Sequence, residues 1–200
     1  MIEKIVTGDF ATNTDIISNL GKCVIVDPGL DFENTAAKIK EKYEVEAILL
    51  THGHMDHIDG IRYFDVPIYI HELESQFLED PSLSLYRIFG SKIPFQKESL
   101  QIVPIKDGMK LELIGYTFKV MHTPGHTRGS VVYSYKDKLL SGDTLFRMSM
   151  GRTDFPTGDS KSMRTSLKKI IEAFPDSTDV YPGHDEKTTI GFERKNNPYL

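Results

Sequence analysis

The chain has 200 residues, 39% of them hydrophobic and 26% charged, and a formal net charge of −5 at pH 7. These values are ordinary for a globular protein. The net charge is negative and the sequence has no dense block of lysine and arginine, which argues against a nucleic-acid partner. A single cysteine, Cys23, excludes an internal disulfide. No apolar run approaches the ~20 residues that span a membrane, and no secretory signal is visible. We expect a soluble, cytoplasmic protein of one domain, residues 1–200, with no membrane partner. The oligomeric state is not indicated.

The first half of the chain alternates predicted strands and helices, which is typical of an α/β protein. The apolar run 23–26 predicts a buried strand that ends at Asp27-Pro28-Gly29. Helical spacing of apolar residues predicts a helix at 33–43, for which Asp31 is a candidate N-cap. Residues 2–6 and 14–18 are short apolar stretches on either side of a polar turn, and the predicted strands of this half are 23–26, 47–50 and 67–70.

The stretch Thr51-His52-Gly53-His54-Met55-Asp56-His57 follows the strand at 47–50 and precedes a short predicted helix. In an extended segment, side chains two residues apart point the same way, so His52 and His54 can hold one metal ion. Asp56 and His57 lie on the turn beyond and are better placed for a second one. Imidazole and carboxylate groups suit zinc, iron or manganese. The chain has only 7 histidines, so this clustering indicates a metal site rather than a chance polar loop.

Residues 71–100 interrupt the alternation with a predicted helical segment. Apolar residues predict two short helices separated by Asp80-Pro81, the first with Leu73, Phe77 and Leu78 and the second with Leu85, Ile88 and Phe89. Because this segment follows the metal motif, we interpret it either as a lid over the site or as a structural insert. His71 is interpreted as a surface residue or as the start of the first helix.

The second half is predicted to be mostly β-structure followed by helix. Hairpins are expected across Gly115 and across Lys136-Asp137, and an amphipathic helix at 160–174 is expected to be capped by Asp159. The chain is expected to end in a polar tail. Since each half runs from strands to helix, we expect two sheets that pack face to face with helices outside. The predicted strands are 101–105, 110–114, 116–121, 131–135, 139–140 and 179–181.

Three further strand ends carry side chains that bind metals. Each combines a glycine, which allows close approach of the backbone, with an imidazole or a carboxylate. A single such turn would be unremarkable, but three of them together with the first motif indicate one shared metal centre. At the end of the strand 23–26, Asp27 is interpreted as an outer carboxylate, because a metal-bound histidine normally needs such a partner. The three turns are His122-Thr123-Pro124-Gly125-His126-Thr127, Ser141-Gly142-Asp143-Thr144 and Tyr181-Pro182-Gly183-His184-Asp185.

As an ordered set, these four segments resemble the metallo-β-lactamase superfamily, and they are most similar to its glyoxalase II-like hydrolases. The resemblance covers nearly the whole chain. It implies an α/β fold, a four-layer αβ/βα sandwich of two mixed β-sheets with helices outside. It also implies two divalent metal ions as cofactors, with zinc first and iron or manganese as alternatives. The implied ligands are His52, His54 and His126 for the first metal and Asp56, His57 and His184 for the second, with Asp143 bridging the two.

The resemblance also implies supporting roles around the metals. Thr51 and Asp27 match positions that hold the ligands from outside. His122 matches no ligand position and is interpreted as structural. The stretch 151–155, which contains Arg152, lies where the family places groups that meet the substrate.

The activity that the resemblance implies is hydrolysis of a small-molecule thioester of the hydroxyacyl-glutathione type. Two metals bridged by the carboxylate of Asp143 would share a water molecule and lower its pKa to about 7, and the resulting hydroxide is the expected nucleophile for the carbonyl. Asp56 is expected to accept a proton as well as to bind metal. The leaving thiol, with a pKa of about 8.5, departs without strong acid assistance.

The sequence departs from full glyoxalase II in its glutathione-binding groups. Only residues 185–200 follow His184, so we expect no C-terminal glutathione-binding domain. Asp154 stands in place of an aromatic residue and Glu186 in place of a tyrosine, whereas Arg152 keeps a basic group. Further candidates for binding a substrate carboxylate or phosphate are Arg147, Arg194 and Lys195, of which the last two are better explained as surface charges.

Three alternative functions stay open at this point. A persulfide dioxygenase on the same fold would need one iron held by His52, His126 and Asp143, a facial triad. A β-lactamase is disfavoured, because the antibiotic-degrading members carry a cysteine where this chain has Asp143 and because no signal peptide is visible. A non-catalytic binding module is disfavoured by the complete ligand set.

Overall fold

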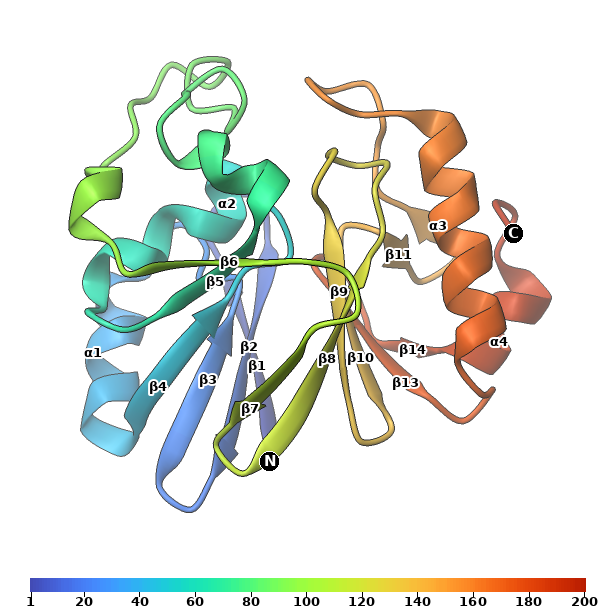
Figure 1. The fold of residues 1–200 in the computed structure, drawn as a ribbon, viewed down its shortest axis with the longest axis horizontal. Helices are drawn as coiled ribbons and strands as arrows, with labels where there is room; N and C mark the ends of the chain where they lie inside the picture. Colours follow the sequence, from blue (N-terminus) through green and yellow to red (C-terminus); the bar gives the residue numbers. More distant parts are fainter.

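The computed structural model describes all residues from 1 to 200 and places twelve of the fourteen strands in two six-stranded sheets. The two sheets pack face to face, and helices cover their outer faces (Figure 1). The helices α1 (Glu33–Lys42) and α2 (Met55–Ile58) lie outside the first sheet, and α3 (Ser160–Ala173) and α4 (Ile190–Asn196) lie outside the second. No helix has the length and apolar character to cross a membrane.

The first sheet has the strand order β1-β2-β3-β4-β5-β6. Its first three strands pair antiparallel, whereas β3, β4, β5 and β6 run parallel, so the sheet is mixed. Parallel strands end at the same edge of a sheet, which brings the turns after β3 and β4 together. The strands are β1 (Ile2–Thr7), β2 (Thr12–Asn19), β3 (Lys22–Val26), β4 (Glu44–Leu49), β5 (Ile68–His71) and β6 (Ile102–Ile105).

The second sheet has the order β14-β13-β10-β9-β8-β7 and is also mixed, because β10 and β13 are parallel while the other pairs are antiparallel. The carboxyl ends of β10 and β13 therefore meet at one edge. A small separate ribbon consists of β11 (Leu145–Phe146) and β12 (Ser149–Met150). The strands of the large sheet are β7 (Lys110–Leu113), β8 (Tyr116–His122), β9 (Val131–Tyr135), β10 (Lys138–Gly142), β13 (Asp179–Pro182) and β14 (Thr188–Thr189).

Three apolar clusters separate the four layers. Alternate strand residues face opposite sides of a sheet: Ile25 packs beneath α1, whereas Val24 lies between the two sheets. In the second sheet, Tyr133 faces the other sheet and Val132 packs against Leu167 of α3. The predicted α/β sandwich of two mixed sheets with helices outside is confirmed.

The helical segments differ from the prediction in two places. Asp31 has a left-handed φ of 55°, and Phe32 occupies the N-cap of α1 without a side-chain cap, so Asp31 is not the cap. Within 71–100, the first predicted helix is a 3-10 helix, η2 (Glu72–Leu78), and the second is absent. Residues 79–96 form turns before the short η3 (Lys97–Ser99). A third 3-10 helix, η1 (Asp59–Tyr63), follows α2.

The C-terminal residues form a helix instead of the predicted polar tail. Thr189 caps α4 by accepting a hydrogen bond from Phe192 N, and the buried Glu193 accepts one from the Thr188 hydroxyl. The polar composition of this segment concealed the helix, because its buried face is partly hydrogen-bonded rather than apolar. The cap predicted for α3 is confirmed, since the Asp159 side chain accepts a hydrogen bond from Ser162 N.

Candidate metal centre

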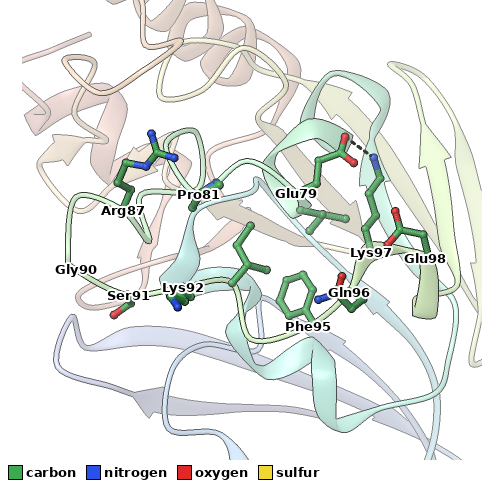
Figure 2. A pocket seen from close by; sticks show the side chains of 12 residues that line it. Glu79, Pro81, Arg87, Gly90, Ser91, Lys92, Phe95, Gln96, Lys97 and Glu98 are labelled. Carbon is green, nitrogen blue, oxygen red and sulfur yellow. Dashed lines mark hydrogen bonds and ion pairs between the residues drawn. The ribbon is translucent and has the colours of Figure 1, made fainter.

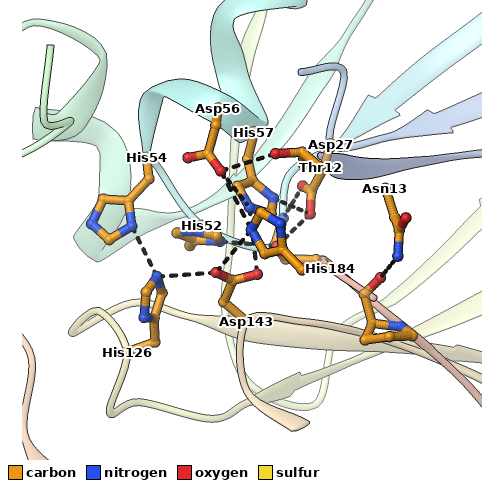
Figure 3. A network of polar contacts seen from close by, with 12 residues as sticks. Thr12, Asn13, Asp27, His52, His54, Asp56, His57, His126, Asp143 and His184 are labelled. Carbon is orange, nitrogen blue, oxygen red and sulfur yellow. Dashed lines mark hydrogen bonds and ion pairs between the residues drawn. The ribbon is translucent and has the colours of Figure 1, made fainter. Parts of the chain in front are cut away.

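The four predicted motifs converge at one edge of the molecule between the two sheets (Figure 3). The turn after β4 supplies His52 and His54, and the short helix α2 that follows it supplies Asp56 and His57. The second sheet supplies the other three candidate ligands from the turns that follow its strands. These are His126 after β8, Asp143 after β10 and His184 after β13.

The first group consists of His52, His54 and His126, whose candidate ligand atoms all lie within 4.8 Å of one another. The closest pair is Nδ1 of His54 and Nε2 of His126, at 2.9 Å. All three rings are buried. Two members come from the first sheet and one from the second, so the group spans the junction between the sheets.

The second group consists of Asp56, His57 and His184, again with ligand atoms within 4.8 Å of one another. The Asp56 Oδ2 lies 3.5 Å from His57 Nε2 and 3.4 Å from His184 Nε2. This arrangement matches the residues that the resemblance implies for the second metal.

Asp143 lies between the two groups. Its Oδ2 is 3.5 Å from Nε2 of His126, in the first group, and 3.5 Å from Nε2 of His184, in the second. Its Oδ1 is 3.4 Å from Nε2 of His57. One carboxylate therefore faces ligand atoms of both groups, as a bridging ligand must.

The ring nitrogens that point away from the centre are held by hydrogen bonds in four of the five histidines, as is usual for metal-bound imidazole. Nδ1 of His57 lies 2.9 Å from the Asp27 carboxylate, and Nδ1 of His52 lies 3.1 Å from the Thr51 hydroxyl. Asp27 in turn accepts hydrogen bonds from the Thr51 amide and hydroxyl. These contacts place Asp27 and Thr51 where the sequence predicted them.

The other two contacts use backbone carbonyls. Nδ1 of His126 donates to Arg152 O at 2.7 Å, and Nδ1 of His184 donates to Phe10 O at 3.1 Å. His54 is the exception, because its outward nitrogen, Nε2, is buried and has no hydrogen-bond partner.

An observation that does not depend on the sequence motifs also indicates that these residues suit divalent metals. Buried polar atoms without partners are rare in proteins, and only five side-chain atoms of this chain are buried without one. Three of them are inward-facing candidate ligand atoms: His52 Nε2, His57 Nε2 and Asp143 Oδ1. Nitrogen and oxygen donors that are buried and unpaired at one point are the arrangement that a metal ion would satisfy.

The electrostatics differ between the two groups. Burial, together with the neighbouring imidazoles, lowers the pKa of His52 and of His54 well below the usual value, and burial also lowers the pKa of His126. These three rings are therefore neutral at pH 7 and can donate lone pairs to a metal without first losing a proton.

In the second group, the carboxylates outweigh burial. Burial would lower the pKa of His57, but Asp56, Asp143 and Asp27 raise it to about 9. Burial likewise opposes the charge on His184, but Asp143 and Asp56 raise its pKa to about 11. Conversely, burial opposes ionisation of Asp143, yet His57 and His184 lower its pKa to about 2. Without metal, this group is a set of ion pairs.

A cavity of about 430 Å³ opens onto both groups. Arg152 lies on its wall, as predicted for a substrate-binding residue, but its guanidinium pairs with both oxygens of Asp154 at 2.7 and 2.6 Å and lies 3.9 Å from the centre of the Phe155 ring. The rest of the wall is largely apolar. The apolar lining residues are Phe10, Met55, Leu85, Phe89, Phe146, Met150 and Phe155.

A second cavity, of about 600 Å³, is formed entirely by residues 78–98 and contains no candidate ligand (Figure 2). Glu79 and Lys97 form an ion pair at 2.9 Å across it. The segment 79–96 thus lines both cavities and contributes Leu85 and Phe89 to the wall of the metal-centre cavity.

The other basic residues predicted as substrate contacts do not line the metal-centre cavity. Arg194 donates to Ile171 O and pairs with Asp176, so it joins α4 to the end of α3. Arg147 lies over the Phe192 ring. Lys195 is an exposed residue of α4. The interpretation of Arg194 and Lys195 as charges outside the site is confirmed.

The two histidines excluded as ligands stack on each other. The rings of His71 and His122 are 4.3 Å apart and nearly parallel. His71 is the N-cap of η2, where its side chain accepts from Leu73 N, so the interpretation as a helix start is confirmed, whereas the alternative of a surface position is not, because the side chain is buried. His122 contacts Arg128 O and is structural, as predicted.

Sequence reasoning missed two contributors to the site. Phe10 lines the cavity and holds His184 through its carbonyl, but its position in a polar turn gave no signal. Glu74 is fully buried beside the ligand turns. Its helical spacing with Phe77 and Leu78, which share the buried face of η2, was the available signal. Leu73, which was assigned to that face, is 44% exposed.

Comparison with known proteins agrees with this geometry. Residues 7–184 match the family model of the metallo-beta-lactamase superfamily, and the chain belongs to that superfamily. One relative, the hydroxyacylglutathione hydrolase GloC of Haemophilus influenzae, is 31% identical over 212 residues, which cover 100% of this chain and 97% of the relative.

Two solved structures are similar over their whole length. The B3 metallo-beta-lactamase BLEG-1 superposes with a TM-score of 0.89 at 37% identity, covering 100% of this chain and 99% of that one. The protein TTHA1623, crystallised in a di-iron-bound form, superposes with a TM-score of 0.87 at 35% identity, covering 99% and 100%. The chain therefore has the fold of metal-dependent hydrolases and carries candidate metal-binding clusters of histidine and aspartate.

Proposed function

We propose that this protein is a binuclear metal-dependent hydrolase that cleaves thioesters of the hydroxyacyl-glutathione type in the cytoplasm. The observation that carries the proposal is the position of Asp143, whose carboxylate lies within 3.5 Å of ligand atoms in both metal-binding groups. A centre that needed a single metal would not require a second complete group of donors.

The proposed ligands are His52, His54 and His126 for one metal and Asp56, His57 and His184 for the other, with Asp143 shared. Two divalent ions held here, zinc first and iron or manganese as alternatives, would supply a water of lowered pKa and a Lewis acid for the carbonyl oxygen. The di-iron form of a relative at 35% identity supports a site for two metals and keeps iron among the candidates.

The chain's own residues complete the chemistry. The Thr12 hydroxyl donates to Asp56 Oδ2 at 2.9 Å and fixes the orientation of this carboxylate, which we propose accepts a proton during the reaction. Apart from the proposed ligands, the titratable residues that line the cavity are Arg152 and Asp185. A thioester suits such a site, because a thiolate leaves with little acid assistance.

The glutathione part of the substrate is supported by the relative GloC. We propose that Arg152 contacts this part, because its side chain lies at the cavity wall and is half exposed. Contact with a substrate carboxylate would require the guanidinium to exchange or share its pairing with Asp154.

The test combines metal content with thioester turnover. We expect close to two metals per chain and hydrolysis of lactoylglutathione, and we expect Asp143→Ala to lose both metals and the activity. Asp137→Ala is the matched control, because it removes an exposed carboxylate that precedes β10, at the opposite end of that strand from Asp143, and that pairs with Lys138 rather than with a candidate ligand. Full activity with a full metal count in Asp143→Ala would overturn the assignment.

Persulfide oxidation is the runner-up on the same ligands. It would need only His52, His126 and Asp143, and it would leave His57 and His184 without a role although they are fully positioned. One iron per chain, together with oxygen uptake in the presence of glutathione persulfide, would replace our proposal with this one.

Lactam hydrolysis is a second candidate because of one observation. The 37% identity with BLEG-1, which extends over the whole chain, supports this activity, whereas Asp143 speaks against it. Turnover of a chromogenic cephalosporin, compared with turnover of lactoylglutathione under the same metal load, decides between the two activities.

A further inference from the structure

Glu74, in η2, has a position that the proposed hydrolysis does not explain. Its side chain is fully buried, and burial raises its pKa to about 7. No cation forms an ion pair with it. A buried carboxylate without such a partner costs stability, and an apolar side chain of similar size would avoid that cost.

Two backbone amides, one from a turn of each sheet, donate hydrogen bonds to this carboxylate. Oε2 accepts a hydrogen bond from Gly53 N at 2.8 Å, and Oε1 accepts one from Gly129 N at 2.8 Å. Gly53 lies between His52 and His54, and Gly129 follows His126 by three residues in the turn between β8 and β9. One side chain thus joins the two turns that supply the first metal-binding group.

The same helix also packs on the ligand turn. A Cβ at Gly53 would overlap the Phe77 side chain, so η2 lies directly against this backbone. The Phe77 ring is 6.0 Å from the His54 ring. The Arg128 side chain, next to Gly129, donates to Leu73 O and to Gln76, so both turns are attached to η2.

His54 is the ligand for which this attachment matters most. It is the one histidine of the centre whose outward nitrogen has no hydrogen-bond partner, so no outer group orients its ring in the usual way. Its ring lies against Phe77 of η2 and, across the cavity wall, near Phe155 at 5.8 Å, and the backbone of its turn is held from η2.

We propose that Glu74 is a positioning residue that sets the distance between His54 and His126 and so determines the affinity of the first metal-binding group, but not that of the second. The inference rests on the proposed metal centre. The second group has its own outer contacts, from Asp27 and from Phe10 O, and none of them involves η2.

The experiment measures cobalt(II) affinity for each group separately, by chelator competition at pH 8. In a His184→Ala background, binding reports the first group; in a His126→Ala background, it reports the second. We expect Glu74→Gln to weaken the first group at least 10-fold, within the range seen when outer contacts are lost, and to change the second less than threefold. Glu72→Gln, on the exposed side of the same helix, should change neither.

Equal weakening of both groups, or no weakening of the first, would show that Glu74 has only a general structural role. If neither background binds cobalt, the metal centre itself is misassigned, which is a different failure. Amide hydrogen exchange of the wild-type protein gives a test that needs no variant. Gly53 and Gly129 should exchange as slowly as strand amides, and exchange at the rate of open loops would overturn the proposal.

Discussion

The carboxylate of Asp27 lies 2.9 Å from Nδ1 of His57, on the opposite side of the ring from the other candidate ligands. This contact fixes the tautomer that leaves Nε2 free to bind metal and strengthens the ring as a donor. We therefore expect Asp27→Asn, which removes the negative charge, to weaken binding at the second group about 10- to 100-fold, as measured by chelator competition.

Asp31→Asn is the control for this substitution. Asp31 and Asp27 both have a left-handed backbone, with φ of 55° and 50°, and asparagine tolerates that region. Asp31 is exposed, and the carboxylate that contacts His57 is that of Asp27. Substitution of Asp31 should therefore leave metal binding unchanged. An effect of the same size in both variants would mean that loop distortion, not the contact with His57, is responsible.

The two groups should respond differently to pH. His57 and His184 have pKa values raised to about 9 and about 11, so metal binding at the second group must displace up to two protons below pH 9. Its affinity should rise steeply from pH 6 to pH 9. The first group, whose histidines are already neutral, should change little. Metal titrations at several pH values in weak buffer, with proton release recorded, measure both slopes; equal slopes would contradict the assignment.

Asp15 predicts a pH-dependent cost to stability. It is buried between the sheets, its Oδ1 has no partner, and burial raises its pKa from 3.8 to about 8. The unfolded chain ionises first, so the free energy of unfolding falls by up to about 1.4 kcal/mol per pH unit between the two values. Asp15→Asn should therefore gain stability over the wild type progressively from pH 5 to pH 8. Urea unfolding at pH 5, 6.5 and 8 tests this, with the exposed Asp9→Asn as control, and a constant difference would refute it.

The aromatic wall of the cavity predicts a preference for apolar substrates. Phe10 and Phe89 meet edge to face with ring centres 4.9 Å apart, and both line the cavity. Phe89→Ala should raise KM for a hexanoyl thioester roughly fivefold, equivalent to about 1 kcal/mol of lost burial, and should affect the acetyl thioester of the same thiol much less. Ile88→Ala is the neighbouring control, because Ile88 is exposed and lies outside the cavity wall. Equal effects on both substrates would exclude acyl contact.

The layers of the fold were predictable from sequence because they depend on residue periodicity. Alternating apolar positions such as Val24 and Ile25 set the two faces of a strand, and the cap at Asp159 is a local signal. The segment 79–96 and α4 were not predictable in the same way. The apolar residues at 85–89 lie in turns rather than in a helix. Helix α4 is held by hydrogen bonds of Glu193, one of which comes from the distant Met148 amide.

The candidate ligands were predictable because each lies in a short motif at a strand end. Their surroundings were not. The carbonyl of Phe10 and the carboxylate of Glu74 reach the centre through contacts across 174 residues and 55 residues of chain, respectively. The spacing of Glu74 with Phe77 and Leu78 indicates burial, but no local pattern identifies the partners of either group, since both sets of contacts depend on how the two sheets pack together.

Phe10 belongs to the cavity wall and to the metal centre at once. Its ring contacts Phe89 at the mouth, while its carbonyl orients His184. A bulky substrate that displaces this ring also strains the turn at 8–11, and if that turn moves, the hydrogen bond that orients His184 is lost. Changes of specificity at this position are consequently constrained by metal retention, whereas changes at Phe89 are not. Directed evolution toward larger acyl groups should accumulate substitutions on the segment 79–96 before it alters Phe10.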